Sequence, residues 1–373
     1  MNKENNKMKT IKLEYQDSII QCLHYQRYIL AISYNASSFL FKIGFYDIDD
    51  SFKFNFAIEF NHEQMYEQWK LYKAKCNSLF LIGYMNEYNG HLDKKENKKL
   101  GIFLLNIEKK TTDKKSVFNY NNFVEDKKGD KLFIENHEAI FSYDFKTNTS
   151  KEKKMEKIEL SNCKRLEIHK LFLVDEYLLL ITLEEYYKWM LGISKTIIID
   201  KNLNIINKIE TEPHEFCFAD FDCSGFYNFI KGFIPISEDT YYISYEESTN
   251  CNFSKIHLKG NENLFNDDDK DKFMDLFEEV TIKLNEKVVN FISLFSLNEE
   301  KFVINFKPNI FYIFNSKNLE LITKLEAEIP SDNFDEQNRF EPKYKLFSLE
   351  LKESYYEIFY SFGKNELLYI TNK

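Results

Sequence analysis

The stretch Thr196–Ile209, with the sequence TIIIDKNLNIINKI, decides the fold. It consists of an apolar run that ends at Asp200, a short polar turn and a second run that contains both apolar and polar residues. The same order returns at Ile310–Leu325, IFYIFNSKNLELITKL. Short apolar runs bounded by polar turn residues are typical of β-strands, and Asn and Lys tolerate tight backbone geometry in turns. Each stretch therefore predicts a strand, a turn and an outer strand.

This pattern recurs along the whole chain. Six apolar runs end in Asp or Asn, and a weaker seventh run has His257 in the equivalent place. The seven runs are Phe41–Asp47, Gly101–Asn106, Ala139–Asp144, Thr196–Asp200, Phe253–Leu258, Ile310–Asn315 and Glu366–Asn372. Their end markers are separated by 59, 38, 56, 57, 58 and 57 residues. Four consecutive spacings within two residues of 57 indicate a structural repeat.

A further apolar run precedes most of the marker runs, and it predicts an additional strand in each unit. These preceding runs are Arg27–Tyr34, Ser78–Tyr84, Glu176–Leu183, Asp239–Tyr245, Glu300–Phe306 and Ser354–Phe362. With one more strand before them and the outer strand after the turn, each unit holds four strands. Helical periodicity is poor almost everywhere, so the sequence predicts an all-β protein.

Seven four-stranded units resemble a β-propeller, and the order of strands and turns within each unit is similar to that of a degenerate WD40-like repeat. The pairs Tyr46-Asp47, Tyr143-Asp144 and Ile199-Asp200 stand where a WD40 blade ends in Trp-Asp. The resemblance implies one domain over residues 1–373, a seven-bladed propeller of four-stranded antiparallel blades. Lys9–Tyr15 is expected to supply the outer strand of the last blade and so close the ring. The alternative is two packed β-domains joined near residues 147–157.

Two units depart from the regular spacing. The third is short, so either it lacks a strand or Val117–Val124 is shared between blades. In the fifth, both His214–Asp220 and Phe226–Ile236 are candidates for the innermost strand. Four segments read as insertions: Asn86–Lys99, the charged turn Lys109–Lys115, the acidic stretch Gly260–Glu279 with a helix expected at Lys270–Glu279, and the irregular connection Pro330–Pro342.

Composition and charge exclude several classes of protein. The formal net charge is -10, and only Arg27, Arg165 and Arg339 are arginines, which argues against a nucleic-acid partner. No apolar run approaches the ~20 residues of a membrane helix, and the start has no secretory pattern, so we expect no membrane partner. The six cysteines are scattered, which favours buried, reduced thiols. An intracellular protein, cytoplasmic or nuclear, of a eukaryotic cell is expected.

Two patterns suggest metal binding, and each has a simpler explanation. His214, Cys217 and Cys223 lie close in sequence, but zinc requires a fourth ligand, and buried cysteines on an inner strand explain them better. Asp267–Glu278 places acidic residues at the ligating positions of an EF-hand loop. Lys272, however, stands where that loop needs glycine, and a solvated acidic loop that caps a helix is the preferred interpretation. No metal or cofactor is therefore expected.

The sequence contains no GxSxG, P-loop or GxGxxG motif, and its 10 glycines leave little material for such loops. We therefore expect no enzyme but a scaffold that binds other proteins as a subunit of a larger complex. The candidate binding residues are Tyr186, Tyr187 and Trp189, because aromatic side chains on a loop are typical interface anchors. Two alternatives remain: a propeller hydrolase or lyase with a site at the central channel, and a calcium-responsive regulator.

Overall fold

The computed structural model describes the greater part of the strands and fewer of the connections. The described residues are 7–12, 18–35, 40–61, 66, 68–84, 98–126, 129–136, 138–155, 164–174, 176–186, 191–211, 234–236, 239–244, 250–256, 260–261, 277–283, 293–298, 301–307, 310–315, 317–326, 344–351, 356–362 and 366–371. Every regular element within these ranges is a β-strand, so the all-β prediction is confirmed.

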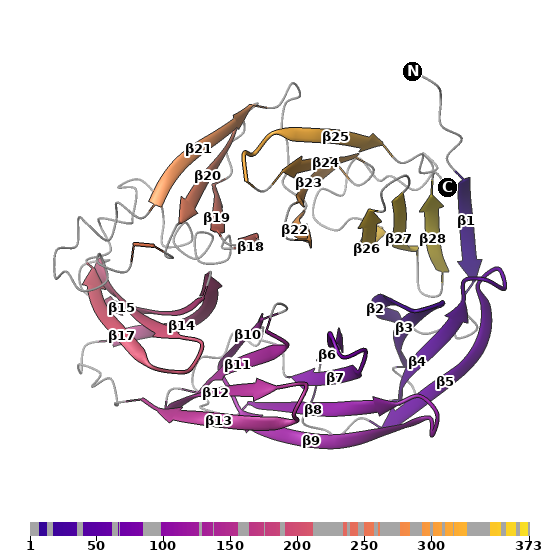
Figure 1. Ribbon diagram of the computed structural model, residues 1–373, viewed down its shortest axis with the longest axis horizontal. Helices are drawn as coiled ribbons and strands as arrows, with labels where there is room; N and C mark the ends of the chain where they lie inside the picture. The colour runs from indigo at the N-terminus through magenta and orange to yellow at the C-terminus, as the bar shows by residue number, and fades with distance from the viewer. Residues whose placement is uncertain are drawn as a thin grey trace. The chain divides into compact units, whose positions relative to one another are not determined.

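The strands pair antiparallel into four-stranded sheets, seven of them within the described residues (Figure 1). The chain divides into two compact units, residues 1–120 with 326–373, and residues 121–325. The first unit holds three sheets. Their strands are β2 (Ser18–Tyr25), β3 (Tyr28–Asn35), β4 (Leu40–Asp47) and β5 (Lys53–Asn61); β6 (Gln68–Lys73), β7 (Leu79–Tyr84), β8 (Lys99–Asn106) and β9 (Thr111–Asn119); and β26 (Tyr344–Leu351), β27 (Tyr356–Phe362), β28 (Glu366–Thr371) and β1 (Lys7–Lys12).

The second unit holds the other four sheets. Their strands are β10 (Asn122–Asp126), β11 (Lys131–Glu135), β12 (Ala139–Asp144) and β13 (Thr149–Lys154); β14 (Lys164–Val174), β15 (Tyr177–Tyr186), β16 (Leu191–Asp200) and β17 (Ile205–Thr211); β18 (Ile234–Ile236), β19 (Asp239–Ser244), β20 (Asn250–Ile256) and β21 (Phe277–Lys283); and β22 (Ser293–Asn298), β23 (Lys301–Lys307), β24 (Ile310–Asn315) and β25 (Leu321–Glu326).

The sheets have the internal order and the packing of propeller blades. Within the first unit, β2 lies against β26 and β6; within the second, β10 lies against β14 and β18 against β22, so first strands of different sheets meet. Side-chain burial is described in five sheets, those that contain β4, β8, β12, β16 and β24. Five blades are thus shown with their cores, whereas the sequence predicts seven. In the other two sheets the described residues show the backbone pairing alone.

The marker runs all form the third strand of a sheet. Ala139–Asp144 and Ile310–Asn315 match β12 and β24 in both bounds. The N-terminal strand was expected at Lys9–Tyr15 and lies at Lys7–Lys12, where it pairs with β28. The prediction that the N-terminus completes the last sheet is therefore confirmed.

The Asp or Asn that ends the third strand folds the turn behind it. Its Oδ1 atom accepts backbone N–H groups from the residues that follow: Asp47 from Asp49 (3.0 Å), Asn106 from Lys109 (2.9 Å), Asp144 from Lys146 and Thr147 (both 2.9 Å), Asp200 from Asn202 and Asn204 (both 2.8 Å), and Asn315 from Lys317 (2.8 Å). A side chain that bonds the backbone in this way substitutes for a backbone turn. The repeated marker is thus a turn signal.

Each of these turns also contains a residue other than glycine in the left-handed region. The φ angles are 56° at Ser51, 54° at Lys110, 56° at Asn148, 71° at Leu203 and 57° at Leu319. Such a conformation is unfavourable for residues with a Cβ atom, so the surrounding hydrogen bonds must hold it. This explains how the chain builds its turns with so few glycines.

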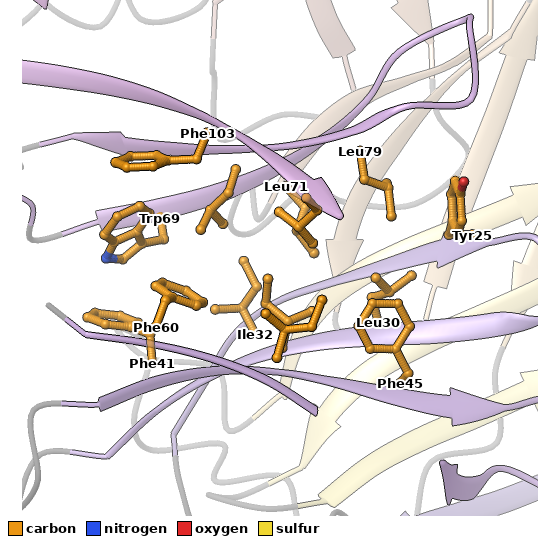
Figure 2. Packing of buried hydrophobic residues seen from close by; sticks show 14 of the residues in the cluster. Tyr25, Leu30, Ile32, Phe41, Phe45, Phe60, Trp69, Leu71, Leu79 and Phe103 are labelled. Atoms are coloured by element: carbon orange, nitrogen blue, oxygen red, sulfur yellow. The ribbon is translucent and has the colours of Figure 1, made fainter. Parts of the chain in front are cut away.

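A layer of aromatic side chains joins the sheet β2–β5 to the sheet β6–β9. Figure 2 shows Phe41 and Phe60 pointing toward Trp69 and Phe103 from the opposite sheet. The Trp69 ring centroid lies 5.0 Å from that of Phe60 and 5.6 Å from that of Phe41. Trp69 of β6 is 4 % exposed, so this layer buries it almost completely.

Polar contacts reinforce the same junction between blades. The Gln21 side chain accepts a hydrogen bond from the Leu71 backbone N–H (2.7 Å), and its amide donates to the Leu71 carbonyl (3.4 Å). The Tyr25 hydroxyl donates to the Asn77 carbonyl (2.7 Å). Gln21 and Tyr25 belong to β2, so the innermost strand of one blade is tied directly to the next blade.

The short third unit retains all four strands, so the interpretation that it lacks a strand is wrong. Val117–Val124 does not act as one shared strand: it is divided between β9 and β10. The spacing shrinks because only Tyr120 and Asn121 separate those two strands. The alternative of two domains joined near residues 147–157 is also wrong, because Thr149–Lys154 forms β13 and pairs with β12.

Other expected segments have mixed outcomes. In the fifth unit β18, Ile234–Ile236, lies at the end of the candidate Phe226–Ile236, whereas His214–Asp220 lies outside the described residues. The prediction of a helix at Lys270–Glu279 is wrong for its last three residues, because Phe277–Glu279 begins β21 and pairs with β20. The charged turn expected at Lys109–Lys115 ends earlier, since β9 starts at Thr111. Residues 85–97 and 327–343, which cover most of the Asn86–Lys99 and all of the Pro330–Pro342 insertions, lie outside the described residues.

The turn at Asp144 allows a direct test of the marker. Asp144→Ala removes both Oδ1 hydrogen bonds and should lower the free energy of unfolding by about 1–2 kcal/mol. Asp144→Asn keeps the acceptor oxygen and should lose less. Chemical denaturation monitored by circular dichroism measures both changes, with Glu152→Ala on the exposed strand β13 as the control. Equal losses for Ala and Asn would contradict a role for the acceptor oxygen.

The same turn should make stability depend on pH. Desolvation pushes the pKa of Asp144 upward, but hydrogen bonds from Thr147 and Lys146 and the charge of Lys131 outweigh it and hold the pKa below its usual value. A lowered folded-state pKa stabilises the protein above the unfolded-state pKa of about 3.9, and this contribution is lost as the pH falls. The difference in stability between wild type and Asp144→Asn should therefore shrink from pH 7 to pH 3. A constant difference would contradict this account.

Candidate functional site

The hairpin β15–β16, in the fourth sheet along the chain, carries the candidate binding residues. Its two strands pair without interruption over ten residues each, from Tyr177↔Asp200 to Tyr186↔Leu191. In the neighbouring sheet β12 has only six residues, the last of which is its marker Asp144. At about 3.3 Å per residue, the four additional residues of β16 lengthen this hairpin by roughly 13 Å. The tip therefore lies farther along its sheet than the corresponding hairpin of the preceding blade.

The tip is supported on one side and open on the other. Strand β14 accompanies β15 to its end, with Lys164 opposite Tyr186, although the register shifts between Lys164 and Leu166. The outer strand β17 stops earlier, where Thr211 pairs with Ser194. The first three residues of β16, Leu191 to Ile193, therefore have no described neighbour on their outer edge.

The predicted residues occupy this tip. Tyr186 is the last residue of β15, and only residues 187–190 separate it from its partner Leu191. The expected connection between two strands of the fourth blade is present, but Tyr186 itself, expected on the loop, ends strand β15. Tyr187 and Trp189 lie outside the described residues, within that four-residue connection.

The base of the hairpin is anchored in a buried core. Leu178 and Leu180 of β15 and Ile197 and Ile199 of β16 are at most 4 % exposed. They form one cluster with Phe133 and Ile140 of the preceding blade, and Leu203 of the turn also belongs to it. A rigid base fixes where the tip points, as a binding loop requires.

An ion pair joins the same two blades at the end of β16 remote from the tip. Lys201 Nζ lies 3.1 Å from Asp126 Oδ2 and 3.3 Å from Glu176 Oε2. The Asp126 side chain is 2 % exposed and that of Lys201 15 % exposed. Lys201 Nζ and Asp126 Oδ2 interact as opposite charges without hydrogen-bond geometry. The other carboxylate oxygen, Asp126 Oδ1, accepts a hydrogen bond from the Gly129 N–H at 3.0 Å. Lys201 therefore neutralises a buried carboxylate across a blade junction, which the sequence analysis missed.

The other sequence-predicted sites are only partly described. His214, Cys217 and Cys223 lie outside the described residues, as do Asp267, Asp269, Asp271 and Asp275. Glu278, the last position of the EF-hand pattern, lies in β21 opposite Lys255. An EF-hand loop continues into a helix, so the continuation into a strand contradicts that pattern. Among the residues that the structure describes, no group of three or more His, Cys, Asp or Glu side chains could hold a metal ion.

Two of the six cysteines have described environments. Cys22 is buried, and desolvation raises the pKa of its thiol, so this cysteine behaves as the expected apolar core residue. Cys76 is exposed, so the expectation that the cysteines are buried is wrong for this residue. It lies in the turn between β6 and β7, where the backbone of Asn77 has a φ angle of 61°.

Comparisons with known proteins leave the chain unassigned to a family: it matches no family model and no curated protein. In the part of the chain that the structure describes, no helix has the length and apolar character needed to span a membrane.

From the ion pair we expect that loss of the Lys201 side chain strongly destabilises the protein. Lys201→Ala leaves the Asp126 charge buried without its partner and should lower the free energy of unfolding by about 3 kcal/mol. Chemical denaturation measures the change. Lys53→Ala is the matched control, because Lys53 lies 3.8 Å from Asp50 and both side chains are more than two-thirds exposed. Its expected loss is between about 0 and 1 kcal/mol.

A second variant separates charge from packing. Asp126→Asn in the Lys201→Ala background removes the buried charge and should recover part of the lost stability. If the double variant is no more stable than Lys201→Ala, or if Lys201→Ala costs no more than Lys53→Ala, the ion pair does not stabilise the blade junction.

Proposed function

We propose that this chain is a WD40-like, seven-bladed β-propeller that acts as a protein-binding scaffold, a subunit of a larger complex in the cytoplasm or nucleus. It binds other proteins through the tip of the β15–β16 hairpin, at Tyr186, Tyr187 and Trp189. It performs no catalysis of its own and requires no cofactor.

The sheet topology supports the ring. Seven four-stranded sheets follow one another, and the last is completed by β1 from the opposite end of the chain. Pairing of the two chain ends within one blade is the device by which propellers protect their sheet edges. Five of the sheets have described cores, and the two that contain β20 and β27 complete the proposed set.

The observation that carries the binding proposal is the length of the hairpin. Ten-residue strands anchored in a shared core present Tyr186 and the residues 187–190 at the end of a sheet. Tyr and Trp contribute large contact areas at little cost in conformational entropy and dominate the binding energy of many interfaces. Neighbouring Glu184, Glu185 and Lys188 supply charges of both signs around them.

Affinity purification from native cells tests the proposal. Tagged wild-type protein should recover stable partners that mass spectrometry identifies, and Tyr187→Ala with Trp189→Ala should deplete at least one of them about tenfold or more. Tyr84→Ala is a position-matched control, because Tyr84 ends β7 as Tyr186 ends β15.

The control defines the contradicting outcomes. Tyr84→Ala should recover the same partners as wild type. Equal partner recovery by the double hairpin variant and wild type would exclude the hairpin as the binding element. A strictly monomeric protein that recovers no partner would contradict the scaffold function itself.

A further inference from the structure

The outer strand β25 differs from the other described outer strands in what it exposes. Leu321 and Ile322 are 51 % and 46 % exposed, more than any other large apolar side chain of the described residues. Strand β13, by comparison, is exposed along its whole length and carries Lys151, Lys153 and Lys154. Lysine on an edge strand discourages pairing with another chain. Strand β25 carries a single lysine, Lys324, and the exposed Leu321 and Ile322 precede it.

The free edge of β25 has a defined set of backbone groups. The Asn315 N–H donates to the Glu320 carbonyl (2.9 Å), so this carbonyl faces the neighbouring strand β24, whereas the Glu320 N–H donates to Asn318 Oδ1 (3.1 Å). Backbone groups alternate in direction along a strand, and those of Leu321 and Thr323 therefore face away from the sheet. They are placed to pair with a further strand.

We propose that β25 pairs antiparallel with β25 of a second copy of this chain, about a two-fold axis at Ile322. This register places Glu320 opposite Lys324 of the second copy, and the symmetry repeats the same pair. It also places Ile322 opposite itself and Leu321 opposite Thr323. The segment Glu320–Lys324 is thus complementary to itself in both charge and apolar character.

The side-chain faces agree with this register. Lys324 Nζ lies 5.6 Å from the centroid of the Tyr312 ring, which places Lys324 on the Tyr312 face of the sheet. Glu320, Ile322 and Lys324 share that face because side chains alternate along a strand. Both ion pairs and the Ile322 contact therefore form a single row across the junction.

The backbone is compatible with the same register. With the axis at Ile322, Leu321 and Thr323 form the two hydrogen-bonded pairs, each of which exchanges both of its bonds. Ile322 then forms a pair without hydrogen bonds, in which opposing side chains approach most closely. The outward backbone groups and the complementary side chains are satisfied together.

Neighbouring registers lack this complementarity. An axis at Thr323 places Glu320 opposite Glu326 and Ile322 opposite Lys324, so like charges meet. An axis at Leu321 places Glu320 opposite Ile322, so a charge meets an apolar side chain. Of these three registers, the one at Ile322 is the one that pairs opposite charges, and this complementarity points to a second copy as the occupant. The pairing is independent of the β15–β16 hairpin, which belongs to another sheet.

Sedimentation velocity of the purified full chain tests the pairing. The contact is short, and the expected dimer is weak, so the sedimentation coefficient of the wild type should rise with loading concentration between about 10 µM and 1 mM. Glu320→Lys alone and Lys324→Glu alone should each weaken self-association about tenfold or more, because both symmetric pairs then hold like charges. The double variant Glu320→Lys with Lys324→Glu restores opposite charges and should associate like wild type.

Mixing the two single variants gives the sharpest outcome. Each variant alone should be a monomer, and the mixture should form a heterodimer, because one chain then carries lysine at both positions and the other carries glutamate at both. Lys208→Glu on the outer strand β17 is the control and should leave association unchanged. Thermal melting followed by circular dichroism confirms that each variant is folded. A wild type that stays monomeric, or a dimer that ignores both charge reversals, would overturn the proposal.

Discussion

The side-chain oxygen of the Asp or Asn that ends the third strand, described in five of the sheets, is the contact on which the rest of the structure depends. At Asp47, Asn106, Asp144, Asp200 and Asn315 this oxygen accepts backbone N–H groups and reverses the chain within a few residues. The outer strand can then pair with the strand just completed. Residues such as Leu203 and Leu319 adopt left-handed backbone angles in these turns, at an energetic cost that the hydrogen bonds offset.

Once the blades form, their faces determine what they can do. Apolar rows pack blade against blade, as in the aromatic layer around Trp69 and the leucine and isoleucine cluster at the base of β15–β16. Polar contacts from Gln21 and Lys201 join neighbouring blades at two of the junctions. A hairpin longer than its neighbour then supplies a rigid support for aromatic side chains. The scaffold function that we propose follows from this support, and the strand edge at Ile322 adds a second surface of different chemistry.

The strand order was predictable because the turn signal is local: Asp200 with its polar turn specifies both the end of one strand and the start of the next. The spacing between markers failed to predict the four strands of the third unit, where only Tyr120 and Asn121 connect two blades. That spacing depends on the lengths of the connections as well as on the number of strands. The acidic run before Phe277 suggested a helix, but pairing of β21 with β20 overrode that local preference. Tyr186 was expected on a loop but ends strand β15. The contact between Lys201 and Asp126 joins residues 75 apart in sequence and leaves no local signal.

A cross-link between the two ends of the chain tests most directly the claim that they complete one blade. Lys9 lies opposite Tyr369 in the pairing of β1 with β28, and opposite residues of an antiparallel pair lie within disulfide reach. Lys9→Cys with Tyr369→Cys should form an intramolecular disulfide under mild oxidation, which mass spectrometry of the monomer fraction identifies. Lys9→Cys with Leu368→Cys should form little, because neighbouring residues on a strand point to opposite faces. No cross-link, or equal cross-linking by the two pairs, would contradict the closure of the repeat by the N-terminal strand.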